Sequence, residues 1–407
     1  MSLSRRGFIA SAGAGVALGA AVGAGAQAYA DSSEPVDAVD LSTSYDFYTG
    51  SHQVGIATPP QRHCIFMTFD LVAGATSKDL QVLLATWSAA IAQLQAGRTV
   101  GQMEPISLSA VATDTGEAYG LSTAGLTVTV GLGPGVFDKR LGLAAHRPKL
   151  LAPLPALPSE SLDPKLTGGD LSVQACADDP QVVYHAIRDL ARLGRGVVEV
   201  GWTVMGFGRA SAGAEQSTPR NLMGYKDGTR NVSTEAQRAE FVWVDDDAAW
   251  AAGGTYQVAR KIQMDIEIWD SATMQTQHEV FGRTKVAGAP LTGTREFDTP
   301  DFHATAGGKP IIDPDSHVAL ASPENNRGLR ILRRGYNFTD GLNEAGQLDA
   351  GLLFIAYMNT PEAFIRLQTK MGRSDKLNEY ITHVGSGVFF VPPAPKPGHY
   401  LAEQLFG

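Results

Sequence analysis

The segment at residues 221–231, NLMGYKDGTRN, holds a carboxylate in a setting where it could do chemistry. Asp227 is followed by Gly228, and because an Asp-Gly pair is common in tight turns, a simple turn is the competing interpretation. Gly224 and Gly228 also allow the backbone to approach a flat ligand closely. An ionised carboxylate beside such a ligand can accept and return a proton, so Asp227 is a candidate general base.

A second segment, residues 315–336, combines one histidine with two consecutive arginines. His317 is one of nine histidines, and a lone histidine is more often a core or surface residue than a ligand. Arg333 and Arg334 follow it within one loop and one strand, and arginines that look buried need anionic partners. Haem propionates or an oxyanion derived from peroxide would supply such partners, so His317 stands out among the histidines as a candidate ligand.

The first half of the chain predicts an α+β unit that could support such a site. Apolar residues recur at helical spacing over residues 77–95, which predicts an amphipathic helix packed on a sheet. Apolar runs and alternation predict the remaining elements: strands 65–71, 126–130, 171–175 and 197–203, and a second helix at 179–193. The resulting order, strand–helix–strand–strand–helix–strand, is that of a ferredoxin-like unit.

A loop rich in Gly, Ala and Ser that ends near Thr218 predicts a domain boundary. We place an N-terminal domain at residues 45–213 and a C-terminal domain at residues 214–407. Beyond the boundary we expect strands at 241–244, 254–269, 351–357 and 387–391, a Gly/Pro/Asp-rich stretch at 287–316, and a helix at 361–371. The strand and helix at 64–95 recur loosely at 351–371, which suggests two similar modules.

The N-terminus predicts export. Residues 4–9, SRRGFI, form a twin-arginine pattern, followed by a Gly/Ala-rich apolar stretch and the small-residue cleavage site AYA at residues 28–30. We therefore expect a leader at residues 1–30 that engages the Tat export machinery, and a polar tail at residues 31–44. A membrane anchor is the alternative, but the stretch is only weakly hydrophobic for a span of roughly 20 strongly apolar residues. We expect no stable span after cleavage and a periplasmic or extracellular location.

Composition restricts the partners and the kinds of metal site. With 407 residues, 43% of them hydrophobic, the chain can bury a full core, and its net charge of −9 disfavours a nucleic-acid or anionic-membrane partner. Cys64 and Cys176 are the two cysteines, too few for a thiolate metal site or an iron–sulfur cluster. Their apolar surroundings favour buried, reduced thiols over a disulfide.

Taken together, these segments resemble the dye-decolorizing (DyP-type) family of haem peroxidases over nearly the whole chain after the leader. The exported deferrochelatase/peroxidase type of that family shares the leader and the long stretch before the histidine. The resemblance implies an α+β fold of two ferredoxin-like domains in a barrel-like arrangement, with antiparallel sheets flanked by helices and one haem b in the C-terminal domain. It rests on residues 47–56 (FYTGSHQVGI), 68–70 (TFD), 221–231, 282–285 (GRTK), 315–317 (DSH), 333–336 (RRGY) and 347–357 (QLDAGLLFIAY).

The family's site residues carry over position by position. His317 matches the proximal iron ligand, and Asp227 and Arg333 match the distal acid and arginine that act on peroxide. Arg283 matches a residue that pairs with a haem propionate, and Asp349 is expected to hold the ring of the proximal histidine. Further cofactor contacts are expected from Gly228, Thr229, Asn231 and again Arg333. Some members carry an asparagine two places after the distal arginine, but this chain has Gly335 there, so no third distal polar residue is expected.

The resemblance and the chemistry of these residues agree. Haem iron with one histidine ligand keeps its sixth position open for peroxide. Asp227 would take a proton from the inner peroxide oxygen and return it to the outer one, while Arg333 stabilises the negative charge that develops there. Since an aspartate acts as a base at lower pH than a histidine, we expect activity to persist in acid.

Other functions stay open at this point. A deferrochelatase would release iron from haem in the same pocket and leave the porphyrin intact. A haem-binding accessory protein would need neither Asp227 nor Arg333, and a cofactor-free binding module would need no iron ligand. The sequence names no physiological electron donor, no tyrosine or tryptophan that relays electrons to the haem, and no homo-oligomeric state.

Overall fold

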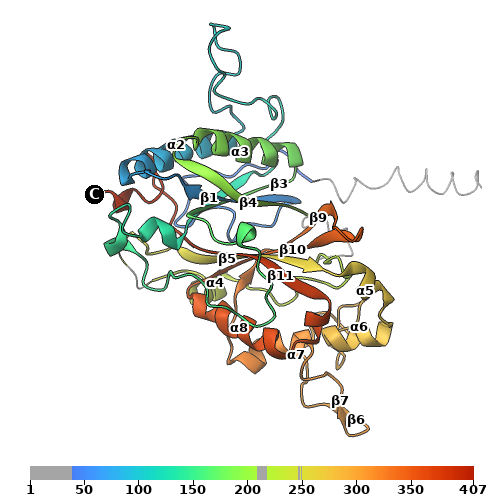
Figure 1. Cartoon of the computed structure of the whole chain (residues 1–407). Helices are drawn as coiled ribbons and strands as arrows, with labels where there is room; N and C mark the ends of the chain where they lie inside the picture. Colours follow the sequence, from blue (N-terminus) through green and yellow to red (C-terminus); the bar gives the residue numbers. More distant parts are fainter. Residues whose placement is uncertain (1–38, 209–217, 246–247, 249) are drawn as a thin grey trace, which may run out of the picture. The chain divides into compact units, whose positions relative to one another are not determined.

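The computed structural model describes residues 39–208, 218–245, 248 and 250–407. The predicted leader, most of the polar tail and the predicted boundary at residues 213–214 lie outside these ranges. From residue 40 on, the described chain forms one compact unit. Its strands all belong to antiparallel pairings, apart from isolated bridges, and helices lie on the outside of the sheets (Figure 1).

The first half of the chain folds in the predicted order. Strands and helices alternate as expected, and the strands lie in the antiparallel order β2-β3-β1-β4, which is the ferredoxin-like arrangement. Both helices cover the same side of this half-sheet (Figure 1). The elements are β1 (His63–Leu71), α2 (Ser77–Gln95), β2 (Thr127–Leu132), β3 (Leu171–Ala177), α3 (Pro180–Leu193) and β4 (Val198–Phe207).

Local sequence signals explain why the two helices begin where they do. Thr76 and Asp79 form a capping box that satisfies the first backbone N–H groups of α2. Asp179 caps α3 by accepting from two backbone N–H groups, and Pro180 follows at the first helical position. Trp87 lies fully buried on the inner face of α2 and donates its indole N–H to the carbonyl of Leu190 on α3.

The second half repeats the same strand order with longer helical connections. Its half-sheet runs β11-β5-β10-β9, again antiparallel. Several short helices replace the single first helix. The elements are α4 (Glu235–Phe241), β5 (Thr255–Met264), α5 (Ile266–Ser271), α6 (Met274–Phe281), β6 (Thr305–Ala306), β7 (Lys309–Pro310), α7 (His317–Ala321), β8 (Leu332–Arg333), β9 (Tyr336–Leu342), β10 (Leu348–Met358), α8 (Pro361–Ser374) and β11 (Ile381–Val391).

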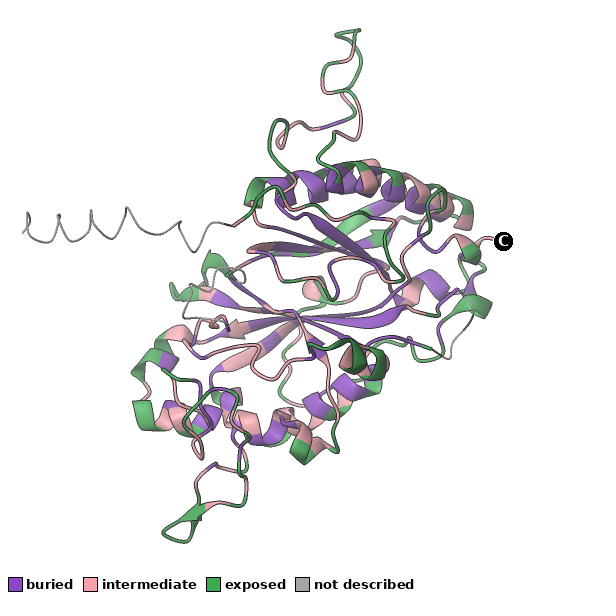
Figure 2. Cartoon of the chain, turned by 180° about the vertical axis from the view of Figure 1, so that it is seen from behind, coloured by how far each residue is buried: buried purple, intermediate pink, exposed green. Residues whose placement is uncertain are grey.

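Two narrow seams join the half-sheets into a closed, barrel-like ring. β2 meets β11 at the pair Leu132–Phe390, and β4 meets β9 at the pair Phe207–Asn337. The strands are buried almost throughout, whereas the helices expose their outer faces (Figure 2). A buried cluster that includes Cys64 fills the ring between the half-sheets. The structure therefore confirms the predicted α+β, barrel-like fold.

Three details of the second half differ from the predictions. The apolar run at 241–244 is not a strand: α4 ends at Phe241, and the residues after it are buried without a strand partner. The predicted strand 254–269 ends at Met264, because Asp265 stands at the N-cap of α5. The strand and helix at 351–371 are the third strand and last helix of their half, so they correspond to β3 and α3, and the predicted match with 64–95 is wrong.

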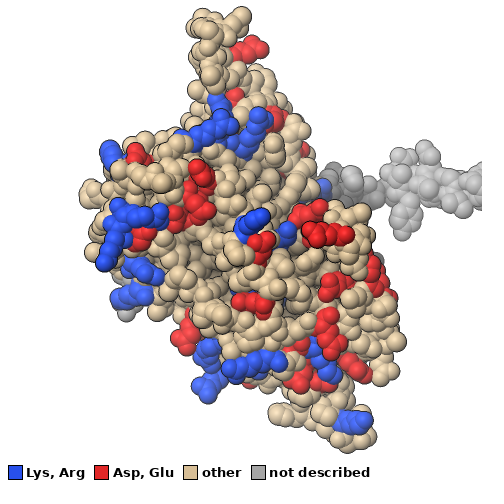
Figure 3. All heavy atoms as spheres, in the orientation of Figure 1, with Lys and Arg blue, Asp and Glu red and all other residues tan. Residues whose placement is uncertain are grey.

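The surface and the helix lengths add two observations. On the face drawn in Figure 3, basic side chains lie in small groups interspersed with acidic ones. Within the described ranges, none of the helices has the length and apolar content needed to cross a bilayer.

Candidate active site

A cavity lies between the outer face of the second half-sheet and the helices α7 and α8. Strands β5, β10 and β11 supply one wall, and loops at 221–231 and 329–333 close the ends. Most of the wall is apolar, as a flat hydrophobic ligand requires. The apolar lining includes Met223, Ile262, Met264, Phe281, Leu352, Phe354, Phe364, Leu367 and Met371.

His317 is the first residue of α7 and lines this cavity. Its Nδ1 lies 2.8 Å from Oδ2 of Asp375, whose side chain is only 3% exposed. The imidazole is 35% exposed, and this surface faces the cavity. Because Nδ1 is engaged by a carboxylate, Nε2 is the nitrogen left for a ligand, and the carboxylate makes the ring a stronger donor to a metal.

The electrostatics of His317 follow from the same contact. Burial alone lowers the pKa of His317, but the charge and hydrogen bond of Asp375 outweigh it and raise the pKa above its usual value. Asp375 is fixed in turn, because it follows the end of α8 and its Oδ1 accepts the backbone N–H of Leu377 at 2.9 Å.

The prediction that Asp349 holds the histidine ring is corrected by this contact. Asp349 lies near the start of β10, partly exposed, and the Nδ1 of His317 is already paired with Asp375. Sequence reasoning missed Asp375 because it lies 58 residues from His317 along the chain. Its position gave no signal either, because an aspartate is an ordinary N-cap for the short helix that begins at Lys376.

Asp227 and Arg333 meet in the same cavity. The Nη1 of Arg333 lies 3.3 Å from Oδ1 of Asp227, and its Nη2 donates to the carbonyl of Thr229 at 3.1 Å. Gly228, which follows Asp227 in the chain, has a φ of +126°, a conformation that favours glycine. This conformation explains why a glycine follows Asp227. Asn231 exchanges two hydrogen bonds with the backbone of Arg333, at 2.7 and 3.0 Å, and so holds the two segments together.

The cavity also has a strongly positive part. Arg283 donates to the carbonyls of Gly288 and Glu296, at 2.7 and 2.9 Å. Burial and the positive charges of Arg230 and Arg333 lower the pKa of Arg283 to about 10, against an opposing effect of Glu296. A buried guanidinium whose charge is disfavoured in this way would be stabilised by an anionic group of the ligand.

A second histidine lines the cavity, and sequence reasoning did not single it out. His383 on β11 is buried, and its Nε2 lies 3.2 Å from Nε2 of Gln368. Burial and the nearby charge of Arg260 lower the pKa of His383 to about 3, so the ring is neutral. The sequence gives no indication of this position, because His383 is buried in the apolar wall and no motif surrounds it.

These features fit haem. Apolar walls suit the porphyrin, the arginines suit its propionates, and an imidazole held by a carboxylate suits its iron. The residues that would hold the group are His317 for the iron, Arg283 for a propionate, and the loop from Asp227 to Asn231 for the edge of the ring.

Comparisons with known proteins agree with this fit. The family model "Dyp-type peroxidase, N-terminal" matches residues 53–208, and "Dyp-type peroxidase, C-terminal" matches residues 218–396. The deferrochelatase of Yersinia pestis is 37% identical over 375 residues, covering 88% of this chain and 84% of that protein. The deferrochelatase of Escherichia coli (strain UTI89) is 36% identical over 371 residues, covering 88% and 86%.

Solved structures of this family also resemble the chain over most of its length. The DyP-type peroxidase of Streptomyces coelicolor superposes with a TM-score of 0.85 at 37% identity, covering 90% of this chain and 98% of that one. An oxyferrous complex of DtpA from Streptomyces lividans superposes with a TM-score of 0.84, with the same identity and coverage. The chain belongs to the DyP-type peroxidase family, whose members are haem-dependent oxidoreductases.

Proposed function

We propose that this chain is a haem b peroxidase that reduces hydrogen peroxide with electrons from small-molecule donors such as dyes or phenols. The observation that carries the proposal is the Asp227–Arg333 contact in the cavity that also contains the His317–Asp375 pair. A protein that only stored or carried haem would need the second pair but not the first.

Each residue has a defined task in this proposal. His317 would hold the haem iron through Nε2, and the iron would supply the site at which peroxide reacts. A carboxylate oxygen of Asp227 takes the proton from one peroxide oxygen and returns it to the other. The guanidinium of Arg333 stabilises the charge that develops on the departing oxygen, since it is fixed beforehand by Thr229 and Asn231. An arginine cannot itself carry the proton, because it does not lose its own near neutral pH.

The test is the rate of the first reaction with peroxide, followed by stopped-flow absorption of the Soret band. Asp227→Asn removes the proton acceptor and keeps the shape, so the rate should fall by about 10²–10⁴-fold while the resting spectrum stays the same. Asp301→Asn changes an exposed aspartate outside the cavity and is the matched control. An unchanged rate in Asp227→Asn removes this residue from the mechanism. His317→Ala should instead lose or weaken haem binding.

A second candidate function is release of iron from haem with the porphyrin left intact. It is favoured by the relatives named deferrochelatase, which are 36–37% identical over 88% of this chain. Incubation with haem without peroxide distinguishes the two functions. Accumulation of protoporphyrin IX supports iron release, whereas peroxide-dependent dye oxidation without porphyrin release supports the peroxidase.

We also propose that residues 1–30 direct export through the Tat machinery to the cell envelope or beyond. The support is the SRRGFI pattern and the AYA cleavage site. Export of an already folded protein would deliver it with its cofactor bound.

A further inference from the structure

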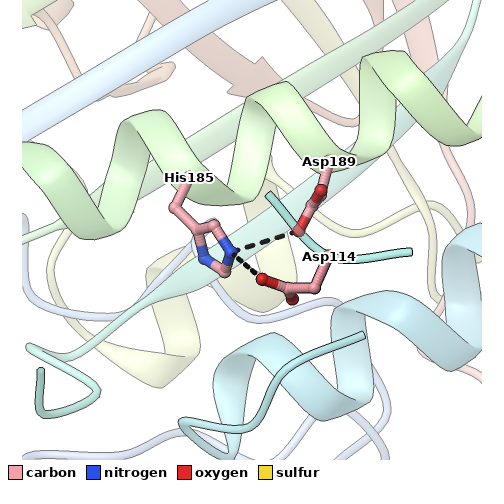
Figure 4. Close-up of side chains that lie close together, drawn as sticks. All are labelled: Asp114, His185 and Asp189. Atoms are coloured by element: carbon pink, nitrogen blue, oxygen red, sulfur yellow. Dashed lines mark hydrogen bonds and ion pairs between the residues drawn. The ribbon is translucent and has the colours of Figure 1, made fainter. Parts of the chain in front are cut away.

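A buried cluster of three side chains lies in the first half of the chain and has no part in the haem cavity. His185 and Asp189 lie one turn apart on α3, and Asp114 comes from the long connection between α2 and β2 (Figure 4). Their side chains are 6%, 0% and 0% exposed. Two carboxylates and one imidazole placed together away from solvent require an explanation, because buried charges are costly unless they are compensated.

The imidazole does not satisfy both carboxylates. Nε2 of His185 lies 3.1 Å from Oδ1 of Asp114 and 3.1 Å from Oδ2 of Asp189. One ring nitrogen carries at most one hydrogen, and the geometry of a hydrogen bond is met only towards Asp114. Within the described chain, neither oxygen of Asp189 accepts a hydrogen bond, although both are buried. Asp189 is therefore a buried carboxylate turned towards the cluster, and its contacts with His185 and Arg192 are ion pairs without hydrogen-bond geometry.

The charges of the cluster suit a doubly positive ion. Even a protonated ring brings one positive charge to two carboxylates. Nη1 of Arg192 lies 3.8 Å from Oδ1 of Asp189, beyond hydrogen-bond length, and this arginine is partly exposed. A divalent cation with a neutral imidazole would balance both carboxylates directly.

We propose that Asp114, His185 and Asp189 bind one divalent transition-metal ion of the zinc or manganese type. One nitrogen and two oxygen donors suit these ions better than Mg²⁺ or Ca²⁺, which prefer oxygen alone. Two donor atoms 3.1 Å apart that each bind a metal at about 2.1 Å enclose an angle of about 95° at the ion. This angle lies near the octahedral value, and water would have to supply any remaining ligands.

The surroundings already orient one of the ligands. Asp114 accepts the backbone N–H of Val100 on Oδ2 at 2.8 Å and that of Gly116 on Oδ1 at 2.7 Å. Such outer contacts hold a ligand in place before the metal arrives. Asp114 belongs to the connecting loop and the other two ligands belong to α3, so the ion would fasten this loop to the helix. Glu117 of the same loop already pairs with Arg188 of α3, on the exposed side.

The test measures metal binding by the holoprotein, with any affinity tag removed and bound metal first stripped by a chelator. Titration calorimetry with Zn²⁺ and with Mn²⁺, and elemental analysis in which haem iron is counted separately, give the stoichiometry. We expect one tight equivalent of at least one of the two ions per chain, and a rise in melting temperature when it is added. Mg²⁺ at the same concentration should give neither.

Variants separate this site from adventitious binding. Asp189→Asn keeps the shape and removes a charged ligand, so the affinity should fall more than tenfold and the rise in melting temperature should disappear. Asp114→Asn should behave in the same way. Glu117→Gln changes a carboxylate of the same loop that is not a ligand, and it should bind like the unmodified protein. Unaltered peroxide reaction rates show that the variants are folded.

Two results would overturn the proposal. One is an unmodified protein that retains no more of either metal than Asp189→Asn does. The other is equal binding by all variants, which would locate the metal elsewhere, for example at the exposed His399–Glu403 pair.

Discussion

Replacing Asp375 by asparagine tests how the site holds its iron ligand. Asp375 uses one oxygen for Nδ1 of His317 and the other for the backbone N–H of Leu377. Asparagine offers one acceptor oxygen in place of two, so one of these hydrogen bonds is lost along with the negative charge. Removing the partner of a metal-bound histidine typically costs about 10–100-fold in metal affinity. We expect haem to bind Asp375→Asn more weakly by a factor in this range.

The assay is transfer of haem to excess apomyoglobin, combined with a spectroelectrochemical titration of the iron. Since a carboxylate on Nδ1 stabilises the ferric form, Asp375→Asn should also raise the midpoint potential, which a purely structural defect would not do. Asp349→Asn is the matched control, because Asp349 lies on β10 and does not contact the ring. Equal effects of the two substitutions, or an unchanged potential in Asp375→Asn, would refute the reasoning.

Two further predictions concern charges in the cavity wall. Arg283→Gln should weaken haem binding by roughly 10-fold or more, the value of a charge-assisted hydrogen bond. The melting temperature of the apoprotein should change little, because removing the disfavoured charge of Arg283 offsets the loss of its hydrogen bonds to Gly288 and Glu296. Haem affinity equal to that of the unmodified protein would contradict this. His383 has a pKa of about 3 in the folded chain, so the unfolded chain binds the additional proton between that value and about 6.5, and stability falls as pH drops through this window. His383 should account for about 2 kcal/mol of the change in stability between pH 7.5 and pH 5, measured by urea denaturation as the difference between the unmodified protein and His383→Gln; the same pH dependence in both proteins would contradict the assignment.

The fold was predictable where the local signals were strong. Helix α2 has the predicted bounds, since Thr76 caps it and its apolar residues keep one face. The strand predicted at 241–244 is absent, because a short apolar stretch does not distinguish a strand from a buried turn. Trp243 is buried there by stacking on His52, with ring centroids 3.6 Å apart. Strand β9 gave no clear signal, because four of its seven residues are exposed.

The site was predictable to the extent that its residues lie within motifs. The motif around Asp227 and the segment from His317 to Arg333 do line one cavity. Asp375 and His383 were missed because each joins the site through long-range packing, with no motif around it. A pattern of residue types predicts which segments meet, but it does not predict which carboxylate of a distant helix end will reach the ring.

The adjacent arginines show how strand geometry divides one motif between two environments. β8 and β9 follow each other along the same edge of β10, and successive side chains on such an edge point to opposite faces. Arg333 therefore lines the cavity, whereas Arg334 is buried and donates to the carbonyl of Thr58 and to Gln61.

Both arginines were expected to have anionic partners, but the structure gives them different environments. Arg333 contacts Asp227. Arg334 lies near the Cys176 thiol instead: burial acts to raise the pKa of this thiol, but the hydrogen bond with Cys64 and the charge of Arg334 outweigh it and lower the pKa. The two cysteines, unbridged as predicted, face each other across β1 and β3. Arg334 and the two cysteines therefore lie together inside the ring, whereas Arg333, the preceding residue, lines the cavity.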